Sequence, residues 1–204
     1  MPNRRDFLLL LGASAFLVVP FRKTSATMAP ELGEMVLGEE DAPVTVIEYF
    51  SLTCEHCMRV HQDVFPQVEE SYIGTGKIRF VARDFPLNDP ALRAAMVARC
   101  LGRERYFGFI AALFDNFDHW TGADDPMRAL ALLAAQSEGM SREDFDACVA
   151  NTELETTVLT SYLTGMTEHE VSGTPTFIIN GRKFEDVTSF EKFEKIVEPI
   201  LSGM

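Results

Sequence analysis

The chain has 204 residues, of which 47% are hydrophobic and 24% are charged, and its net charge is −13 at pH 7. This length predicts one domain, or one domain that carries an insertion, and the apolar content is sufficient for an ordinary globular core. The acidic balance argues against partners with phosphate backbones, so no nucleic acid is expected, and against anionic membrane surfaces.

The first 28 residues have the layout of an export signal. Arg4-Arg5 precedes an apolar run from Phe7 to Val19, and small residues follow. This order predicts a signal peptide over residues 1–28, and the paired arginines favour the twin-arginine route. A membrane anchor is the alternative, but about 20 apolar residues are needed to span a bilayer and this run is shorter. We therefore expect a periplasmic protein of residues 29–204 once the signal is removed.

A strand–helix–strand unit is predicted next. Pro43–Phe50 is rich in β-branched and aromatic residues, which is typical of a buried strand. Thr53 can cap a helix from Cys54 to about Tyr72, and Lys77–Phe85 has the pattern of a second strand. This order favours two parallel strands joined by a right-handed crossover.

The chain from about 87 to 170 is expected to be an all-helical insertion. Proline at helix starts, glycine at helix ends and capping boxes mark five helices. They run from Asp89-Pro90 to Gly102, over roughly Arg105–Phe117, from Asp125-Pro126 to about Gly139, from Ser141 over a short stretch, and from Thr152 to about Glu170.

Strand character returns at Thr176–Ile179, and Asn180-Gly181 predicts a tight hairpin into Arg182–Phe184. A last helix with one apolar face is expected from Thr188 to Leu201, and Pro199 should kink or end it. The elements together predict an α/β fold in which helices flank a mixed sheet.

The chain has four cysteines, Cys54, Cys57, Cys100 and Cys148. In an exported protein they meet an oxidising compartment, where disulfides persist. The even number favours a structural disulfide between Cys100 and Cys148, which would contribute roughly 4 kcal/mol on the chain-entropy model. Two buried free thiols are the alternative.

Cys54-Glu55-His56-Cys57 lies where the first predicted strand passes into its helix. At a helix N-terminus, unpaired backbone N–H groups and the helix dipole favour a thiolate, which is the nucleophile in disulfide exchange. Cys57 is close enough in sequence to close a disulfide with Cys54. His56 can add positive charge beside the thiolate, whereas Glu55 acts in the opposite direction. We therefore predict a catalytic, oxidising Cys54–Cys57 disulfide and no other cofactor.

A zinc site and a plain structural disulfide are two other interpretations of this pair. Zinc would need further ligands, and His61 is the only obvious neighbour in the sequence, so no metal is expected. A structural disulfide is unusual at the start of an amphipathic helix that directly follows a buried strand.

Two further residues are candidates for the site. Glu48 lies inside the first predicted strand; it is either an outward-facing surface residue or a proton acceptor beneath the helix. Pro175 directly precedes the strand Thr176–Ile179, where proline is tolerated at a strand's first residue; an ordinary trans turn is the alternative.

Glu48 to Cys57 resembles the active-site segment of the DsbA family of periplasmic disulfide oxidoreductases, and Gly173-Thr174-Pro175-Thr176-Phe177 resembles its cis-proline loop. The resemblance extends from about Glu34 to the C-terminus and implies a thioredoxin-like fold. It further implies that Cys54 attacks, Cys57 resolves, and Glu48 relays protons to Cys57. It also implies that Thr174 and cis-Pro175 line the substrate groove beside Cys54. Glu55 is a further candidate for contact with the substrate.

The resemblance implies an oxidase that introduces disulfides into unfolded or reduced exported proteins. A membrane redox partner would regenerate its disulfide, and the protein would be a monomer. Proline is common in the family where this chain has Glu55, and threonine before the cis-proline also occurs in related isomerases and reductases. Isomerase and reductase therefore remain alternatives, together with a non-enzymatic holdase for unfolded exported chains.

Overall fold

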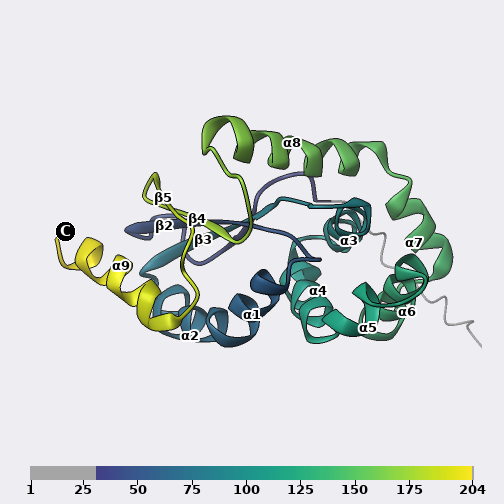
Figure 1. Cartoon of the computed structure of the whole chain (residues 1–204), viewed down its shortest axis with the longest axis horizontal. Coiled ribbons are helices and arrows are strands. Elements are labelled where there is room, and N and C mark those ends of the chain that lie inside the picture. Colours follow the sequence, from purple (N-terminus) through teal and green to yellow (C-terminus); the bar gives the residue numbers. More distant parts are fainter. Residues whose placement is uncertain (1–30, 204) are drawn as a thin grey trace, which may run out of the picture.

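The computed structural model describes residues 31–203 and shows a mixed five-stranded sheet with helices on both faces (Figure 1). The predicted export signal, residues 1–28, lies outside the described residues. The order of the strands in the sheet is β1-β3-β2-β4-β5. In chain order the strands are β1 (Met35–Leu37), β2 (Val44–Phe50), β3 (Ile78–Asp84), β4 (Thr176–Ile179) and β5 (Arg182–Phe184).

β2 and β3 are parallel, as the sequence predicts, with Val46 opposite Phe80 and Phe50 opposite Asp84. The other three pairings, β1 with β3, β2 with β4 and β4 with β5, are antiparallel. The sequence does not predict β1, because three residues are too few to show an alternating pattern.

Alternation along β2 sends its side chains to opposite faces of the sheet. Val46 and Phe50 belong to the larger hydrophobic core, whereas Tyr49 packs in a separate cluster with Phe85. Glu48 has the same parity as Val46 and Phe50. Its carboxylate is therefore directed into the larger core and not toward solvent.

The helix after β2 is interrupted, so the prediction of one helix from Cys54 to about Tyr72 is wrong. The chain forms α1 (Glu55–Asp63), α2 (Phe65–Val68) and a π-helical turn (Glu69–Ile73). Pro66 accounts for the break, because proline has no N–H for the carbonyl four residues earlier and its ring crowds that carbonyl.

Six helices separate β3 from β4 and form the helical insertion (Figure 1). They are α3 (Asp89–Cys100), α4 (Arg103–Asp115), α5 (Phe117–Thr121), α6 (Pro126–Glu138), α7 (Arg142–Val149) and α8 (Thr152–Glu168). The sequence predicts five of them. The sixth, α5, separates from α4 at Asn116, whose side-chain amide donates to the carbonyl of Ala112. The cap of α8 is Asn151, not Thr152.

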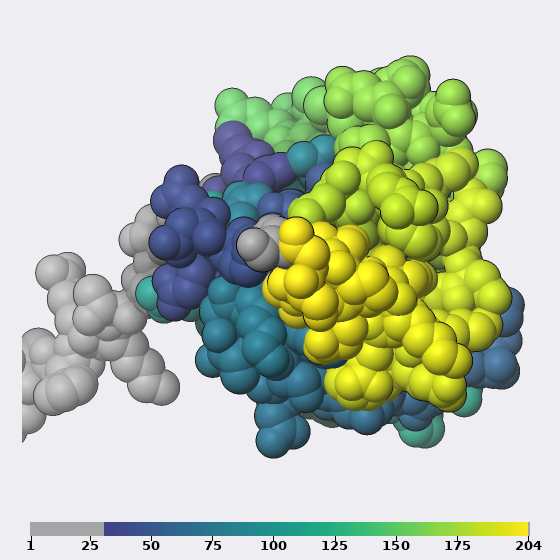
Figure 2. Space-filling view, turned by 90° about the vertical axis from the view of Figure 1, so that its left-hand side faces the viewer, coloured from purple at the N-terminus to yellow at the C-terminus, as the bar shows by residue number. Residues whose placement is uncertain are grey.

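The last helix, α9 (Phe190–Ser202), is capped by Ser189 and continues past Pro199. Of the two predicted effects of Pro199, an end of the helix is therefore excluded, and a kink stays a prediction. α9 packs beside the π-helical turn, where the rings of Tyr72 and Phe193 are 5.8 Å apart and the Tyr72 hydroxyl donates to Glu198 at 2.7 Å. Figure 2 shows this end of the molecule, with α9 in yellow across it.

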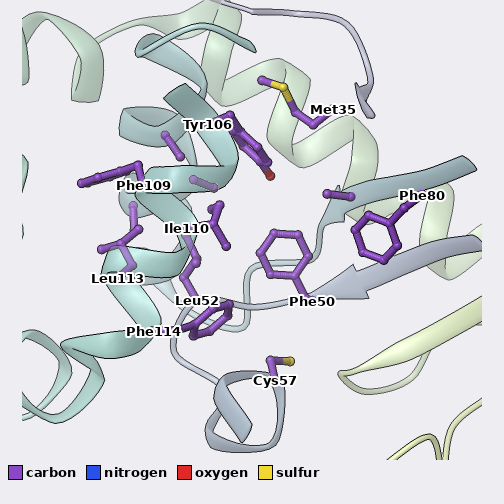
Figure 3. Packing of buried hydrophobic residues seen from close by; sticks show 14 of the residues in the cluster. Met35, Phe50, Leu52, Cys57, Phe80, Tyr106, Phe109, Ile110, Leu113 and Phe114 are labelled. Atoms are coloured by element: carbon purple, nitrogen blue, oxygen red, sulfur yellow. The ribbon is translucent and has the colours of Figure 1, made fainter. Parts of the chain in front are cut away.

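The core joins the sheet to the insertion through α4. Figure 3 shows a row of buried α4 side chains, of which Ile110 lies on the side of the helix nearer Phe50, the last residue of β2, and Phe109 lies on the far side. Leu52, which follows β2, packs in the same core. All are at most 2% exposed, so the end of β2 is fixed by apolar packing. The α4 residues in this row are Tyr106, Phe109, Ile110, Leu113 and Phe114.

A buried ionic network and a disulfide brace the insertion. Arg99 donates to Asp84 at 2.5 Å and Tyr106 donates to the same carboxylate at 3.0 Å, so β3, α3 and α4 meet at one acid. Beside this network Cys100 of α3 and Cys148 of α7 form a disulfide with a Cα–Cα distance of 5.8 Å.

α8 lies on the face of the sheet opposite α1 (Figure 1) and leads into the loop before β4. Gly165 lets the helix approach the sheet, because a Cβ there would lie 2.8 Å from the ring of Tyr49. The hydroxyl of Tyr49 shares a 2.8 Å hydrogen bond with Nδ1 of His169, and the N–H of Val171 donates to the carbonyl of Gly165 at 2.9 Å. These contacts fix where the following loop begins.

Among residues 31–203, none of the helices combines the length and the apolar character that crossing a bilayer requires.

Replacing both Cys100 and Cys148 with alanine should lower the free energy of unfolding by about 4 kcal/mol, since the cross-link closes a long loop in the unfolded chain. Denaturant melts of the double variant and the parent chain, both with Cys54 and Cys57 reduced, measure the difference. Superimposable melts would contradict a structural role for this disulfide.

Candidate active site

The loop between β2 and α1 is held by its neighbours. The N–H of Cys54 donates to the carbonyl of Ser51 at 3.1 Å, and the Ser51 hydroxyl accepts from the N–H of Leu87 at 3.3 Å. The Thr53 hydroxyl donates to the side chain of Asn88 at 3.2 Å. The start of the insertion therefore fixes the turn that carries Cys54, and Thr53 serves in this contact and not as a helix cap.

Cys54 is itself the N-cap of α1. The backbone N–H of Cys57 donates to its sulfur at 3.3 Å, which is the contact that a capping side chain makes. Both cysteines are free thiols, but Cys54 is 8% exposed and Cys57 is 0% exposed. Cys54 is therefore the more accessible of the two residues, and Cys57 is fully shielded from solvent.

This environment lowers the pKa of Cys54 to about 6, and the main cause is its hydrogen bond with the Cys57 side chain. Partial burial opposes the shift, whereas the Thr174 side chain and the backbone N–H groups of Cys57 and His56 add to it. At neutral pH the reduced protein therefore carries a thiolate at Cys54.

The pKa of Cys57 moves in the opposite direction, well above its usual value. Burial is the main cause, and the hydrogen bond to Cys54, the charge of Cys54 and the charge of Glu48 add to it. At neutral pH Cys54 is therefore a thiolate, whereas Cys57, three residues later, is a neutral thiol.

The loop before β4 lies against Cys54. The peptide bond between Thr174 and Pro175 is cis, and the Cys54 sulfur lies 3.3 Å from the carbonyl oxygen of Thr174, to which it donates when it is a neutral thiol. Pro175 is buried and Thr174 is half-buried. The structure thus brings together two segments that are 120 residues apart in the chain.

Glu55 and His56 are both exposed. Glu55 pairs with Arg59 one turn later in α1, and this partner offsets part of its negative charge. Arg59 is not among the site residues predicted from the sequence, although its i, i+4 spacing from Glu55 is a recognisable signal. His56 contributes through its backbone N–H; the electrostatic effect of its imidazole stays a prediction.

Glu48 is buried, with 0% exposure, which excludes the alternative of an outward-facing surface residue. Its Oε2 lies 3.2 Å from Nε2 of His61 on α1. The N–H direction does not complete a hydrogen bond, and in the described structure neither carboxylate oxygen has a donor. The sequence predicts no pairing of His61 with Glu48; there His61 is only a candidate zinc ligand.

A thiolate that is only partly shielded from solvent, next to a fully buried neutral thiol, can carry out thiol–disulfide exchange. Cys54 attacks a substrate disulfide, or its sulfur is attacked by a substrate thiolate. Cys57 then closes the internal disulfide in the first case and is released from it in the second. Within residues 31–203 the structure holds no cluster of three or more His, Cys, Asp or Glu side chains arranged for a metal ion.

Comparison with known families and proteins agrees with this chemistry. Residues 31–199 match the family described as Thioredoxin. A Rickettsia prowazekii protein with the provisional name of a protein-disulfide oxidoreductase is 32% identical over 88% of this chain and 66% of its own. This chain thus spans just under two thirds of that relative's length.

The similarity extends to solved structures. The α-DsbA1 protein of Wolbachia pipientis superposes with a TM-score of 0.78 at 28% identity, covering 84% of this chain and 92% of that one. BdbD of Bacillus subtilis, at 20% identity and a TM-score of 0.72 over 85% of this chain and 96% of that one, shares the fold.

Alkylation of the reduced protein should occur at Cys54, with a rate that inflects near pH 6 because the pKa of this thiol is lowered to about 6. Peptide mapping after iodoacetamide treatment between pH 4 and 9 provides the rates. Cys54→Ser is the control and should take up no label at acidic pH. An inflection near the usual thiol pKa, or labelling of Cys57 before Cys54, would refute the assignment.

Proposed function

Because the chain belongs to the thioredoxin family and is a DsbA-like member of it, we propose that it is a protein-disulfide oxidoreductase that introduces disulfide bonds into exported proteins. The observation that carries the proposal is the opposite shift of the pKa values of Cys54 and Cys57. This difference decides both the direction of exchange and the order in which the two sulfurs react.

Donation of a disulfide takes two exchange steps. A substrate thiolate attacks the Cys54 sulfur of the Cys54–Cys57 disulfide, the S–S bond breaks, and Cys57 leaves with the electron pair and takes up a proton. A second substrate thiolate then attacks the substrate sulfur of the mixed disulfide and expels Cys54 as a thiolate. The substrate is oxidised by two electrons, and the dithiol centre is reduced by two.

The lowered pKa of Cys54 favours this direction. A thiolate of low pKa is a good leaving group, so the mixed disulfide resolves toward the oxidised substrate. The stabilised thiolate exists only in the reduced protein, so it lowers the free energy of that state and makes the disulfide oxidising. This supports the oxidase over the reductase.

Substrate binding is proposed on the exposed side of Cys54. The carbonyl of Thr174, 3.3 Å from the Cys54 sulfur, belongs to a loop that an extended substrate chain can follow beside Pro175. The exposed side chain of Glu55, the residue after Cys54, is proposed to lie at the edge of this binding surface. Leu87, 53% exposed and bonded through its N–H to Ser51, offers an apolar contact for an unfolded chain.

We place this activity in the periplasm. The signal layout of residues 1–28 supports export, and the Cys100–Cys148 disulfide suits an oxidising compartment. Each turnover leaves the centre reduced, so continued activity requires a membrane redox partner that accepts two electrons from Cys54 and Cys57.

The test is oxidative refolding of a reduced, unfolded ribonuclease by the oxidised protein in stoichiometric amount. Disulfides should appear in the substrate as fast as they disappear from the Cys54–Cys57 pair, and Cys54→Ser should abolish the reaction. The Cys100→Ala/Cys148→Ala variant is the control and should retain exchange at temperatures where it is folded.

Other outcomes identify the alternatives. Correction of scrambled ribonuclease without net oxidation would indicate an isomerase, and preferential reduction of insulin a reductase. Suppression of substrate aggregation that survives Cys54→Ser, without exchange by the parent chain, would indicate a holdase. Each of these results would overturn the oxidase proposal.

A further inference from the structure

His61 and Glu48 form a buried pair behind the redox centre. Their side chains are 7% and 0% exposed, and Nε2 of His61 is 3.2 Å from Oε2 of Glu48. Neither Glu48 oxygen nor this nitrogen has a hydrogen bond in the described structure. Burying an acid and a base without other partners costs free energy, which suggests that the pair has a task beyond packing.

Aromatic rings hold the imidazole in place. His61 stacks on Phe65 with ring centroids 5.1 Å apart, and the rings of Phe114 and Phe50 lie at 4.6 and 5.6 Å. Phe50 and Phe114 belong to the same hydrophobic core as Cys57, and Figure 3 labels all three. The imidazole is therefore fixed in one position, with one nitrogen toward Glu48.

His61 also borders a cavity of about 420 Å³ between α1, α2 and α4. The volume is ample for several water molecules, and polar side chains line part of it. His61 thus lies between a buried carboxylate on one side and a space that water can enter on the other. The lining includes Gln62, Phe65, Glu69, Phe107, Phe114 and Asp115.

The exchange reaction needs a proton at this place. Cys57 is 0% exposed, so a proton cannot come to it directly from bulk water when it leaves the disulfide. The charge of Glu48 is near enough to act on Cys57. In its protonated form Glu48 can therefore give a proton to Cys57, but the resulting carboxylate is 0% exposed and must receive a new proton.

We propose that His61 connects Glu48 with the cavity, so that protons pass between water, His61, Glu48 and Cys57 as the disulfide opens and closes. This inference rests on the proposed function and adds a second residue to its proton path. When Cys57 leaves with the electron pair of the S–S bond, Glu48 protonates it and His61 returns a proton to Glu48. The reverse sequence removes the proton when the disulfide forms again.

The charges around the pair suit this role. The titratable groups that face it are Cys57 from α1, Tyr106 from α4 and, across the cavity, Glu69 and Asp115. None of these four groups can carry positive charge, so within this described set of residues and the pair itself His61 is the one group that can be a cation. It is a positioning and proton-transferring residue that acts through Glu48, not a group that touches the reacting sulfurs.

The test measures single-turnover formation of the mixed disulfide between oxidised protein and a monothiol peptide, by acid quench and mass spectrometry from pH 5 to 9. His61→Gln keeps a polar side chain of similar length without a transferable proton, and the rate should fall about tenfold or more. The curve of this rate against pH should also differ in shape between His61→Gln and the parent protein. Gln62→Ala, which borders the same cavity, is the matched control and should follow the parent profile.

Two further arms separate proton transfer from packing. In His61→Ala, imidazole should restore the rate, whereas pyrazole, a weaker base of the same shape, should not. Glu48→Gln combined with His61→Gln should be no slower than the slower single variant, because the two residues act in one path. Equal rescue by both compounds, or multiplicative losses in the double variant, would overturn the inference.

If the variants do not fold, the unaltered protein still provides a test. The carbon chemical shifts of the His61 imidazole, assigned through its contacts to Phe65 and Phe114, should differ between the oxidised and reduced protein at the same pH. Identical shifts would overturn the inference. A parent chain without any exchange would instead refute the proposed function, whereas fast exchange that is indifferent to His61 would refute only the proton path.

Discussion

The rest of the site depends on the contact between the sulfur of Cys54 and the backbone N–H of Cys57, 3.3 Å apart. It makes a thiol the cap of a helix and places that sulfur where the helix dipole favours negative charge. The same turn of helix carries Cys57 inward, away from solvent. One local geometry therefore produces a reactive thiolate and a protected thiol from two identical side chains.

Keeping this geometry explains much of the surrounding fold. α4 packs Phe114 and its neighbours against the end of β2, Ser51 and Thr53 bond to Leu87 and Asn88, and α8 directs the chain toward the loop of Thr174. The helical insertion thus supports the active-site turn from one side, and the cis-proline loop approaches it from the other. A dithiol on a flexible loop would lack these constraints, and its two sulfurs would differ less.

Local patterns in the sequence were sufficient for the central elements. Val44–Phe50, the Asn180-Gly181 hairpin and most helix starts follow from residue types a few positions apart, and a strand followed by Cys-x-x-Cys already indicates redox chemistry. Other features depend on contacts distant in the chain. The sequence alone does not show whether Glu48 faces the core or that His61 contacts it. Both depend on how α1 packs against β2. The break at Pro66 and the cap at Cys54 do have local sequence signals. The helical spacing of the apolar residues favours one continuous helix, however, and Thr53 is the more usual type of capping residue.

The central claim is that the fold stabilises the Cys54 thiolate, and the pH dependence of stability tests it most directly. The pKa of Cys54 is about 6 in the folded reduced protein and is expected near 9 when unfolded, so the thiolate's contribution is lost as pH falls through 6 and is complete above 9. Between these limits the free energy of unfolding of the reduced form, relative to the oxidised form, should rise by about 1.4 kcal/mol per pH unit. The raised pKa of Cys57 acts against stability only at higher pH. The Cys54→Ser variant, which cannot form the disulfide and is compared with the same oxidised parent, should lack this rise. A gap between the two redox forms of the parent that stays constant from pH 6 to 9 would contradict the account.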